Sequence, residues 1–216
     1  MPEESRLYAS VRGGANDGEQ RFIEANQSRE LLVAQGFPRY TELSRRGYGW
    51  QVMDTSATAA VVVRPSTVAG LTLWNGEAAS TGKVYVIDRV GAFNLVTTDA
   101  VHAWSLWGCL HPSMVAPTAD ITAIKGYAGG TYSGLASVDT GATVLDSGWF
   151  ILSTFGVVGN PGTTTPGNAL VFDTDGRFIV KPGAGFSINV VASLTGDTFT
   201  HMISWFEVPP GFLTVD

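Results

Sequence analysis

The sequence predicts an all-β protein, an antiparallel, jelly-roll-like β-sandwich with an extended, partly helical N-terminal arm. Short runs of β-branched and aromatic residues recur along most of the 216 residues, and turn residues separate them. No segment after residue 50 shows helical periodicity. The runs leave room for about eight strands, which is the number that a jelly roll uses.

A change of composition divides the chain into two predicted parts. Residues 1–46 hold seven of the 13 basic residues and seven of the 19 acidic ones, so their formal charges cancel. The rest of the chain is poor in charge and carries the whole net charge of -6. We therefore expect an arm over residues 1–50 and a β-sandwich over residues 51–216. Because the body is acidic, we expect no binding of nucleic acid.

The arm contains the segment that suggests a helix. Residues 19–36 read EQRFIEANQSRELLVAQG, and their apolar residues form a partial stripe. Gly36 would suit the C-terminal cap of such a helix. The sequence therefore predicts a helix within the arm.

Hydropathy gives no sign of a membrane segment. The longest aliphatic run, 59–63, is far shorter than the roughly 20 apolar residues that span a bilayer. The opening residues also lack the apolar centre of an export signal. We therefore expect no membrane association, and folding in a cytosol.

The body is expected to consist of strands joined by turns. Before the last pair, the predicted strands are 59–63, 71–74, 83–96, 101–107, 142–153 and 168–172. The clearest pattern comes last, where residues 185–194 and 198–208 flank the tripeptide TGD and alternate in the manner of half-buried strands. The sequence predicts that these two runs form an antiparallel hairpin.

Two segments resemble ligand-binding loops without matching them. Residues 76–83, GEAASTGK, have one residue too many between the glycines of a phosphate-binding loop, and a strand is expected to follow them instead of a helix. Residues 173–176, DTDG, begin like a calcium loop, but Ala184 stands where a bidentate Glu is required. We interpret the first as a hairpin loop and the second as an Asp-rich turn.

Candidate nucleophiles and acid–base groups are sparse. The segment 130–134, GTYSG, is not the strained turn of a serine hydrolase. Asp146, Asp173 and Asp175 could meet in space, although turns explain them equally well. Neither pattern predicts catalysis.

Cysteine and histidine also give little indication of chemistry. The single cysteine, Cys109, cannot form an intramolecular disulfide and lies among large apolar residues, as a small buried hydrophobe does. His111 would share a strand face with it, so a catalytic pair is not excluded. His102, His111 and His201 lack the short spacings of zinc sites. We expect no catalytic residue, no metal and no cofactor, and we do not predict an enzyme.

Two stretches of the chain resemble a group of virion proteins of tailed bacteriophages. The first is YTELSRRGYGWQV with the following VVVRPSTVAGLTLWNGEAASTGKVYVIDRV, and the second is the segment 182–207, which ends in TFTHMISWFE. The residues that carry the resemblance are Arg39, Tyr40, Arg46, Gly47, Leu73, Trp74, Asn75, Gly76, Lys83, Val86, Ile87, Asp88 and 182–207.

The resemblance implies a virion structural protein, a capsid decoration or cement protein with a jelly-roll body on the capsid surface. Such proteins commonly form trimers on the shell, so the expected partners are further copies of this chain, as a homotrimer, and the major capsid protein. Assembly would take place in the cytoplasm of a bacterial host, which agrees with the single cysteine.

The segment 36–50, GFPRYTELSRRGYGW, gathers arginine and aromatic residues, which are enriched at the energetic centres of protein interfaces. We predict that it is an extended strip that docks onto a neighbouring subunit or the shell. The alternative is that it packs on its own body, with Arg45 and Arg46 solvated. The predicted interface residues are Arg39, Tyr40, Glu42, Arg45, Arg46, Tyr48 and Trp50.

A second class of function stays open. Jelly rolls also serve as receptor- or glycan-binding modules in tails and head fibres, where exposed aromatic rings stack on sugars. Trp104, Trp107, Trp149 and Trp205 are the candidates, although a tryptophan in an alternating strand more often belongs to the core. A minor component of the shell, head fibre or tail is a third possibility.

Overall fold

The computed structural model describes residues 8–10, 20–22, 40–79, 82–97, 101–118, 121–126, 128, 134–159 and 169–209. The chain divides into two compact units, Met1–Thr41 and Glu42–Asp216. The second unit begins before the boundary at residue 50 that the change of composition suggests. Among the described residues of both units, no helix has the length and apolar character needed to cross a membrane.

The first unit contains a small antiparallel sheet of β1 (Tyr8–Ser10) and β2 (Gln20–Phe22). The predicted helix over residues 19–36 is wrong where it overlaps β2, because Gln20 pairs with Ser10 across this sheet. A partial apolar stripe does not outweigh cross-strand pairing. The remainder of that helix lies outside the described residues.

The second unit is built almost entirely of strands. Its elements are α1 (Thr41–Arg45), β3 (Gly49–Met53), β4 (Thr58–Ala59), β5 (Leu71–Asn75), β6 (Val84–Val96), β7 (Val101–His111), β8 (Ile124–Lys125), β9 (Ala136–Thr140), β10 (Phe150–Gly159), β11 (Ala169–Asp173), β12 (Ile179–Val180), β13 (Gly185–Ala192) and β14 (Thr198–Val208). The prediction of an all-β protein is confirmed.

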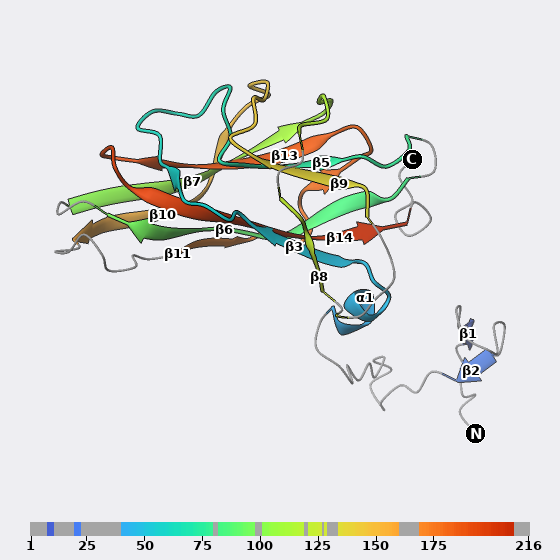
Figure 1. Cartoon of the computed structure of the whole chain (residues 1–216). Coiled ribbons are helices and arrows are strands. Elements are labelled where there is room, and N and C mark those ends of the chain that lie inside the picture. The colour runs from blue at the N-terminus through green and yellow to red at the C-terminus, as the bar shows by residue number, and fades with distance from the viewer. Residues whose placement is uncertain are drawn as a thin grey trace. The chain divides into compact units, whose positions relative to one another are not determined.

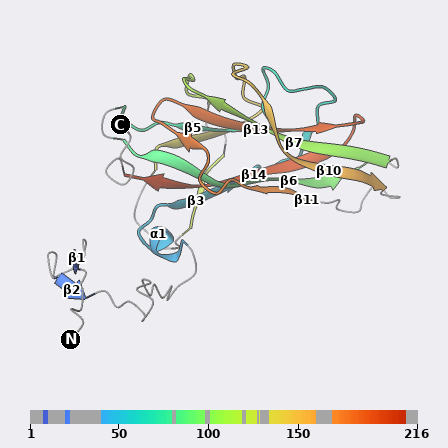
Figure 2. The same ribbon diagram turned by 180° about the vertical axis from the view of Figure 1, so that it is seen from behind.

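The strands form two antiparallel sheets that face each other as a sandwich (Figure 1; Figure 2 shows the opposite side). One sheet has the order β10-β7-β13-β5-β9. The other has the order β11-β6-β14-β3-β8, and the short strands β12 and β4 pair with β6 and β14. Most consecutive strands therefore belong to opposite sheets.

The predicted hairpin at the end of the chain is wrong. β13 pairs with β5 and β7 in the five-stranded sheet, whereas β14 pairs with β6 and β3 in the seven-stranded sheet. Residues 193–197 thus cross from one sheet to the other. Alternation of apolar and polar residues is the same for a hairpin and for such a crossing, because either way each strand turns one face to the core.

Two predicted strands are shorter than expected. Of residues 59–63, only Ala59 belongs to a strand, and Val61 makes an isolated bridge to Val191. Of residues 142–153, the first eight form no strand, and β10 begins at Phe150. Val62, Val63 and Leu145 in these segments are exposed, so a run of β-branched residues does not by itself make a strand.

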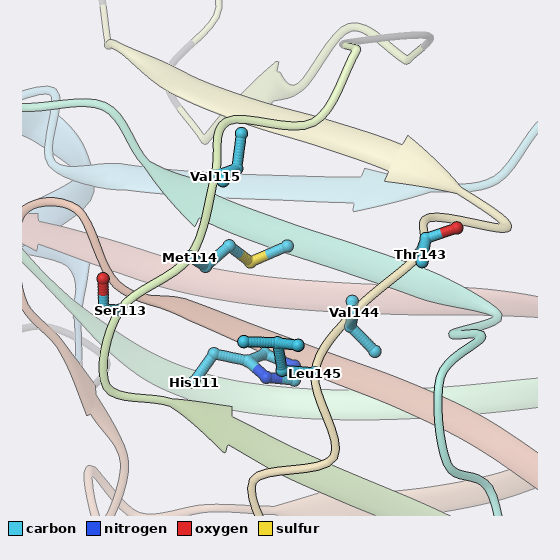
Figure 3. Close-up of a pocket in the computed structure, with 7 residues that line it drawn as sticks. All are labelled: His111, Ser113, Met114, Val115, Thr143, Val144 and Leu145. Atoms are coloured by element: carbon cyan, nitrogen blue, oxygen red, sulfur yellow. The ribbon is translucent and has the colours of Figure 1, made fainter.

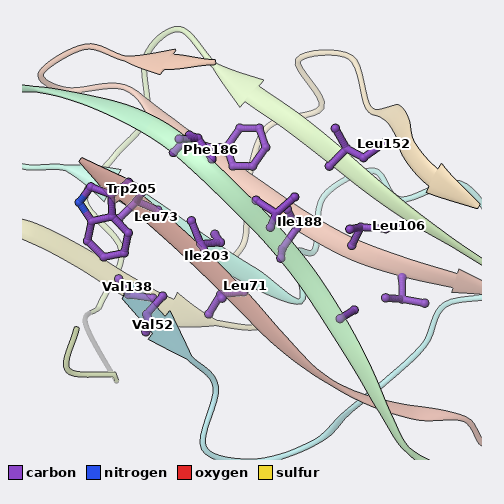
Figure 4. Packing of buried hydrophobic residues seen from close by; sticks show 14 of the residues in the cluster. Val52, Leu71, Leu73, Leu106, Val138, Leu152, Phe186, Ile188, Ile203 and Trp205 are labelled. Atoms are coloured by element: carbon purple, nitrogen blue, oxygen red, sulfur yellow. The ribbon is translucent and has the colours of Figure 1, made fainter. Parts of the chain in front are cut away.

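The main core fills the space between the two sheets (Figure 4). Leu71, Leu73 and Phe186 of the five-stranded sheet meet Ile203 and Trp205 of the seven-stranded sheet, and all five side chains are buried. At this burial, each such side chain stabilises the fold by about 1.5–3 kcal/mol relative to an exposed one. The inner faces of both sheets therefore hold the sandwich together.

A second, smaller core covers the outer face of the five-stranded sheet. It consists of Ala69, Cys109, Ala142, Val144 and Trp149. The segments before β5 and before β10 lie against each other here, since the Ala69 amide donates to the Ala142 carbonyl at 3.1 Å. The Trp149 indole donates to the carbonyl of Ser66 at 3.0 Å. This sheet thus has apolar contacts on both of its faces.

We expect Leu73→Ala to destabilise the protein by about 2–5 kcal/mol, because it leaves a cavity in the main core. The matched control is Leu145→Ala, since Leu145 is 73% exposed and its truncation should change stability by no more than about 0.5 kcal/mol. Urea denaturation of both variants measures the difference. Equal stabilities would contradict the core described here.

Candidate functional site

The predicted interface residues do not form one extended strip. Thr41–Arg45 is the short helix α1, a turn follows at Arg46 and Gly47, and the chain then enters β3. Arg45 and Arg46 are exposed, Tyr40 and Tyr48 are half-buried, and Trp50 is buried. Arg39 and the side chain of Glu42 lie outside the described residues.

The turn after α1 is a helix stop that requires glycine. The amide of Tyr48 donates to the carbonyl of Leu43 at 3.0 Å, and the amide of Gly47 donates to that of Ser44 at 2.9 Å. These two bonds are those of a Schellman motif, in which the residue after the cap adopts a left-handed conformation. Gly47 has a φ of 83°, which an L-residue with a side chain adopts only at a cost. The turn fixes where Arg45 and Arg46 lie.

Tyr40, at the start of this segment, has an unusual backbone conformation. Its φ is 87°, in a region that bulky residues rarely occupy. Such strain costs on the order of 1–3 kcal/mol and is concentrated at functional positions. Tyr40 is therefore a candidate functional residue of this segment.

Trp50 belongs to the core of its own body and not to an exposed interface. Its ring stacks on that of Trp205, with 6.5 Å between centroids and 11° between planes. The Lys125 ammonium lies 5.8 Å from the centroid of the Trp50 ring. For Trp50, the structure therefore agrees with the alternative in which the segment packs on its own domain.

Helix α1 lies against the outer face of the seven-stranded sheet. Gly49 is packed so closely that a Cβ there would lie 3.1 Å from Ser44 Oγ and 3.4 Å from the Phe206 ring. Phe206 pairs with Gly49 and lies between Trp205 and Glu207, which face inward, so it points to the outside. Phe206 is nevertheless buried, and α1 is the element that contacts this end of the face.

An ion pair with one buried partner lies next to this segment, and no sequence pattern predicted it. Lys83 Nζ lies 2.6 Å from Glu207 Oε2 and 3.3 Å from Glu77 Oε1. Glu207 is buried, and its backbone amide donates to the Tyr48 carbonyl at 2.8 Å. Gly134 covers it so closely that a Cβ at that position would collide with Glu207 Oε1.

Burial dominates the electrostatics of this cluster. Desolvation raises the pKa of Glu207, and the hydrogen bond and charge of Lys83 offset only part of that rise. Burial alone would lower the pKa of Lys83, but its hydrogen bond to Glu207 and the two carboxylate charges outweigh burial and raise it. Burial and the same two carboxylates also raise the pKa of Tyr85. The interaction with Lys83 therefore offsets only part of the free-energy cost of burying the Glu207 carboxylate.

Asn75 joins the same region from the end of β5. Its side-chain amide donates to the carbonyls of Lys83 and Val180 at 3.0 and 2.9 Å, and its Oδ1 accepts from the Glu77 amide at 3.0 Å. Asn75, Lys83 and Glu207 all lie in the stretches that carry the bacteriophage resemblance. No local signature links Lys83 with Glu207, since the two residues are 124 positions apart.

A shallow pocket of about 240 Å³ lies on the covered side of the five-stranded sheet. Figure 3 shows it between the segment of Ser113, Met114 and Val115 and the segment of Thr143, Val144 and Leu145. Its walls are mainly apolar, and His111 also lines it. It suits an apolar group the size of one or two side chains.

The pair of Cys109 and His111 is present but is poorly suited to nucleophilic chemistry. Cys109 Sγ lies 3.9 Å from His111 Nδ1, and His111 Nε2 lies 2.8 Å from Ser187 Oγ, which in turn lies 2.9 Å from Thr72 Oγ1. Burial raises the pKa of the Cys109 thiol and lowers that of the His111 imidazole. Both groups are thus held neutral, whereas a reactive cysteine needs its thiolate.

Two of the candidate carboxylates, Asp146 and Asp173, belong to different ion pairs. Asp146 pairs with Arg64 at 2.6 Å, and Asp173 pairs with Arg89 at 2.5 Å. Asp175 lies in a turn closed by the Arg177 amide on the Thr174 carbonyl at 3.0 Å, as the Asp-rich turn reading predicted. A strand, β6, follows residues 76–83, again as predicted.

Histidine and serine candidates add no metal or catalytic cluster. His201 Nδ1 lies 2.9 Å from Asp54 Oδ2 inside the body, and the side chain of His102 lies outside the described residues. Most of the segment 130–134 also lies outside them. Within the described part of the chain, no three His, Cys, Asp or Glu residues are placed to hold a metal ion.

The candidate tryptophans for glycan binding are mostly in the core. Trp104, Trp149 and Trp205 are buried, and the Trp104 indole donates to Asp197 Oδ2 at 2.8 Å. Trp107 is half-buried and donates to Ser105 Oγ at 2.8 Å. Only Trp107 of the four therefore has part of its ring accessible for stacking.

No protein-family model matches this chain, and no curated protein matches its sequence.

We expect Gly47→Ala to destabilise the protein by about 1–2 kcal/mol, because alanine is strained at the left-handed φ of 83°. The matched control is Gly91→Ala, since Gly91 lies in a strand without a positive φ and a Cβ there meets no atom closer than 3.3 Å. Thermal denaturation compares the two. A smaller loss for Gly47→Ala than for the control would contradict the helix stop.

Glu207 makes stability depend on pH. Because its pKa is raised in the folded state, the folded protein binds the proton more tightly than the unfolded chain does. This contribution therefore favours folding at low pH and is lost as pH rises from the ordinary value of 4.5 through the folded pKa. We expect Glu207→Gln to flatten the stability profile in that window. Urea denaturation from pH 4 to pH 8 measures it, with Asp173→Asn as the exposed control, and unchanged slopes would refute the assignment.

Proposed function

We propose that the chain is a virion structural protein of a tailed bacteriophage, a capsid decoration or cement protein on the head surface. The observation that carries the proposal is the way in which α1 is held against its own domain. Two exposed arginines lie on a helix end that a glycine stop and the buried Trp50 hold in place. Fixed, exposed arginines beside half-buried tyrosines are typical of an interface centre, because little side-chain and backbone freedom is lost on docking.

Charge supports a partner surface for this segment. The basic residues are concentrated in residues 1–46, whereas the rest of the chain carries the net charge of -6. The acidic body of a second copy is therefore a favourable partner for Arg45 and Arg46, and complementary charge also speeds association. The proposed partners are further copies of the chain, as a homotrimer, and the major capsid protein.

The proposed body is a jelly roll, and the strand pairing supports it. Eight strands pair antiparallel in a nested series: β3 with β14, β5 with β13, β6 with β11, and β7 with β10. The first strand thus pairs with the last, the second with the second last, and so on inward. A long hairpin rolled up on itself produces this nesting, with four of the eight strands in each sheet.

An assembly role also suits the placement of the reactive groups. Cys109 is buried and neutral, and Glu207 is enclosed between Lys83 and Gly134. Such groups shape and fix the body, whereas the side chains of Arg45 and Arg46 are exposed. No cofactor is part of the proposal, and assembly would take place in the cytoplasm of the bacterial host.

The test reverses the charge of the helix end in the full chain. We expect Arg45→Glu with Arg46→Glu to weaken self-association and binding to empty phage shells by at least tenfold, because both sites face the partner. Light scattering gives the mass, and co-sedimentation measures shell binding. Thermal melting checks that the double variant is folded.

The control reverses two other exposed charges, Arg177→Glu with Lys181→Glu, and so makes the same change of net charge. Equal assembly of both double variants would contradict the interface. Specific binding to a glycan array, without binding to shells, would favour the receptor module instead.

A further inference from the structure

An asparagine followed directly by a glycine occurs once in the chain, at Asn75 and Gly76. Asparagine is one of the chemically labile residues of proteins. It is most labile before glycine, because no side chain there obstructs attack of the following main-chain nitrogen on the asparagine side chain. In an unfolded form of this chain, Asn75 is therefore the asparagine most prone to deamidation.

Deamidation at this position proceeds in two steps. The Gly76 nitrogen forms a bond to Asn75 Cγ while the bond between Cγ and Nδ2 breaks, and ammonia leaves with the proton of the Gly76 amide. Water then opens the succinimide ring at one of its two carbonyls, which gives aspartate or isoaspartate. The side chain thereby loses both of its hydrogen-bond donors and gains a negative charge, and isoaspartate also lengthens the main chain by one methylene group.

The fold uses every feature of the asparagine side chain at position 75. This side chain is buried at the end of β5. Its Nδ2 donates to the carbonyls of Lys83 and Val180 at 3.0 and 2.9 Å, and its Oδ1 accepts from the Glu77 amide at 3.0 Å. A carboxylate of the same length can accept hydrogen bonds but cannot donate them. The contacts of Asn75 therefore require the amide and exclude its deamidation product.

The fold also requires glycine at position 76. A Cβ at Gly76 would lie 2.4 Å from the Leu135 carbonyl oxygen and 2.8 Å from the Trp74 ring. The carbonyl oxygen belongs to the main chain, so it cannot move aside as the end of a flexible side chain can. The two residues that make the chain labile are thus the two residues that its structure needs at this place.

The folded state opposes ring closure. Asn75 lies in a strand, where the extended main chain holds the next nitrogen away from Cγ. The Asn75 amide donates to the Ala184 carbonyl at 3.0 Å, and the Asn75 carbonyl accepts from the Gly183 amide at 2.8 Å. Turning the main chain toward Cγ breaks this pairing and pulls Nδ2 from its two acceptors. Attack in the folded protein therefore costs several buried hydrogen bonds before the new bond forms.

A chain that has been deamidated cannot restore these contacts. A carboxylate at position 75 faces the carbonyl oxygens of Lys83 and Val180, which then have no donor from this side chain. The nearby Lys83 ammonium already serves the carboxylates of Glu77 and Glu207, at 3.3 and 2.6 Å. A buried charge without a partner, next to two carbonyl oxygens, opposes folding.

We propose that Asn75 and Gly76 form a deamidation site that reacts only in the unfolded chain, and that deamidation there prevents the chain from folding again. The site limits how long a chain can stay unfolded and still reach the native sandwich. This inference does not depend on the proposed virion function, because it concerns contacts within one chain.

The first experiment measures deamidation of the full chain at mildly alkaline pH, in native buffer and in denaturing guanidinium chloride. Peptide mapping by mass spectrometry follows the gain of one dalton at each asparagine. Asn94 and Asn189 are internal controls, since leucine and valine follow them. We expect Asn75 to react faster than both controls in denaturant, and at least tenfold more slowly in native buffer than in denaturant. Equal rates at Asn75 under the two conditions would overturn the inference.

The second experiment tests refolding after removal of the denaturant. The matched control is a sample held in denaturant for the same time at mildly acidic pH, where the Gly76 nitrogen attacks slowly. We expect the control to regain its native circular dichroism and the deamidated molecules to stay unfolded. Deamidated molecules that refold to the stability of the parent chain would contradict the proposal.

Two variants separate the effect of the charge from the loss of hydrogen bonds. Asn75→Asp reproduces the main-chain length and charge of one product, and Asn75→Ala removes the same side-chain hydrogen bonds without adding a charge. We expect both variants to be less stable than the parent chain in urea denaturation, and Asn75→Asp to be at least as unstable as Asn75→Ala. An Asn75→Asp variant as stable as the parent chain overturns the inference.

Discussion

The stacking of Trp50 on Trp205 is the contact on which the arrangement of this protein depends. It joins the first long strand of the body, β3, to the last, β14, at the centre of the seven-stranded sheet. Trp205 also lies 6.2 Å from Tyr85 of β6, so three strands meet at one aromatic cluster. Because Trp50 directly follows the turn after α1, the same contact sets the position of the exposed arginines. The position of the exposed arginines is thus set by an aromatic contact in the core.

The buried pair of Lys83 and Glu207 shows a different kind of constraint. Removing the Glu207 charge from water is expensive, and the attraction of the half-buried Lys83 recovers only part of that cost, which is why the pKa of Glu207 is raised. Such a pair adds little net stability compared with apolar residues of similar size. The pair fixes the position of two chain segments: Lys83, which directly precedes β6, lies 2.6 Å from Glu207 of β14, and Asn75 of β5 donates to the Lys83 carbonyl at the same place. Three chain segments are thereby fixed relative to one another.

The two outer faces of the sandwich differ in how they are covered. Loops cover the five-stranded sheet, and their own small core isolates Cys109 and the His111 network from solvent. On the seven-stranded sheet, Met53 and Val171 keep 44% and 43% of their surface exposed.

Local pattern was sufficient for the class of the fold and for most strands. Runs such as 71–74, 83–96 and 168–172 lie in strands because β-branched and aromatic residues suit a half-buried pleated surface wherever it occurs. The helix stop at Gly47 lay within the segment singled out, although the sequence analysis treated that segment as extended. The ion pair of Lys83 and Glu207 could not be predicted from the sequence, since the residues are 124 positions apart and neither has a local signature.

By itself, the sequence determined that this chain is a β-protein with an acidic body and an arginine- and tyrosine-rich segment before it, because composition and alternation are properties of neighbouring residues. Only the tertiary structure decided which strands pair. The alternation of residues 185–194 is equally compatible with a hairpin and with a crossing between sheets, and the choice depends on long-range partners on β5 and β7. The same long-range packing decided that Trp50 is core and that Met53, three residues later, is surface, because the strand turns successive side chains to opposite faces and only one face meets the second sheet.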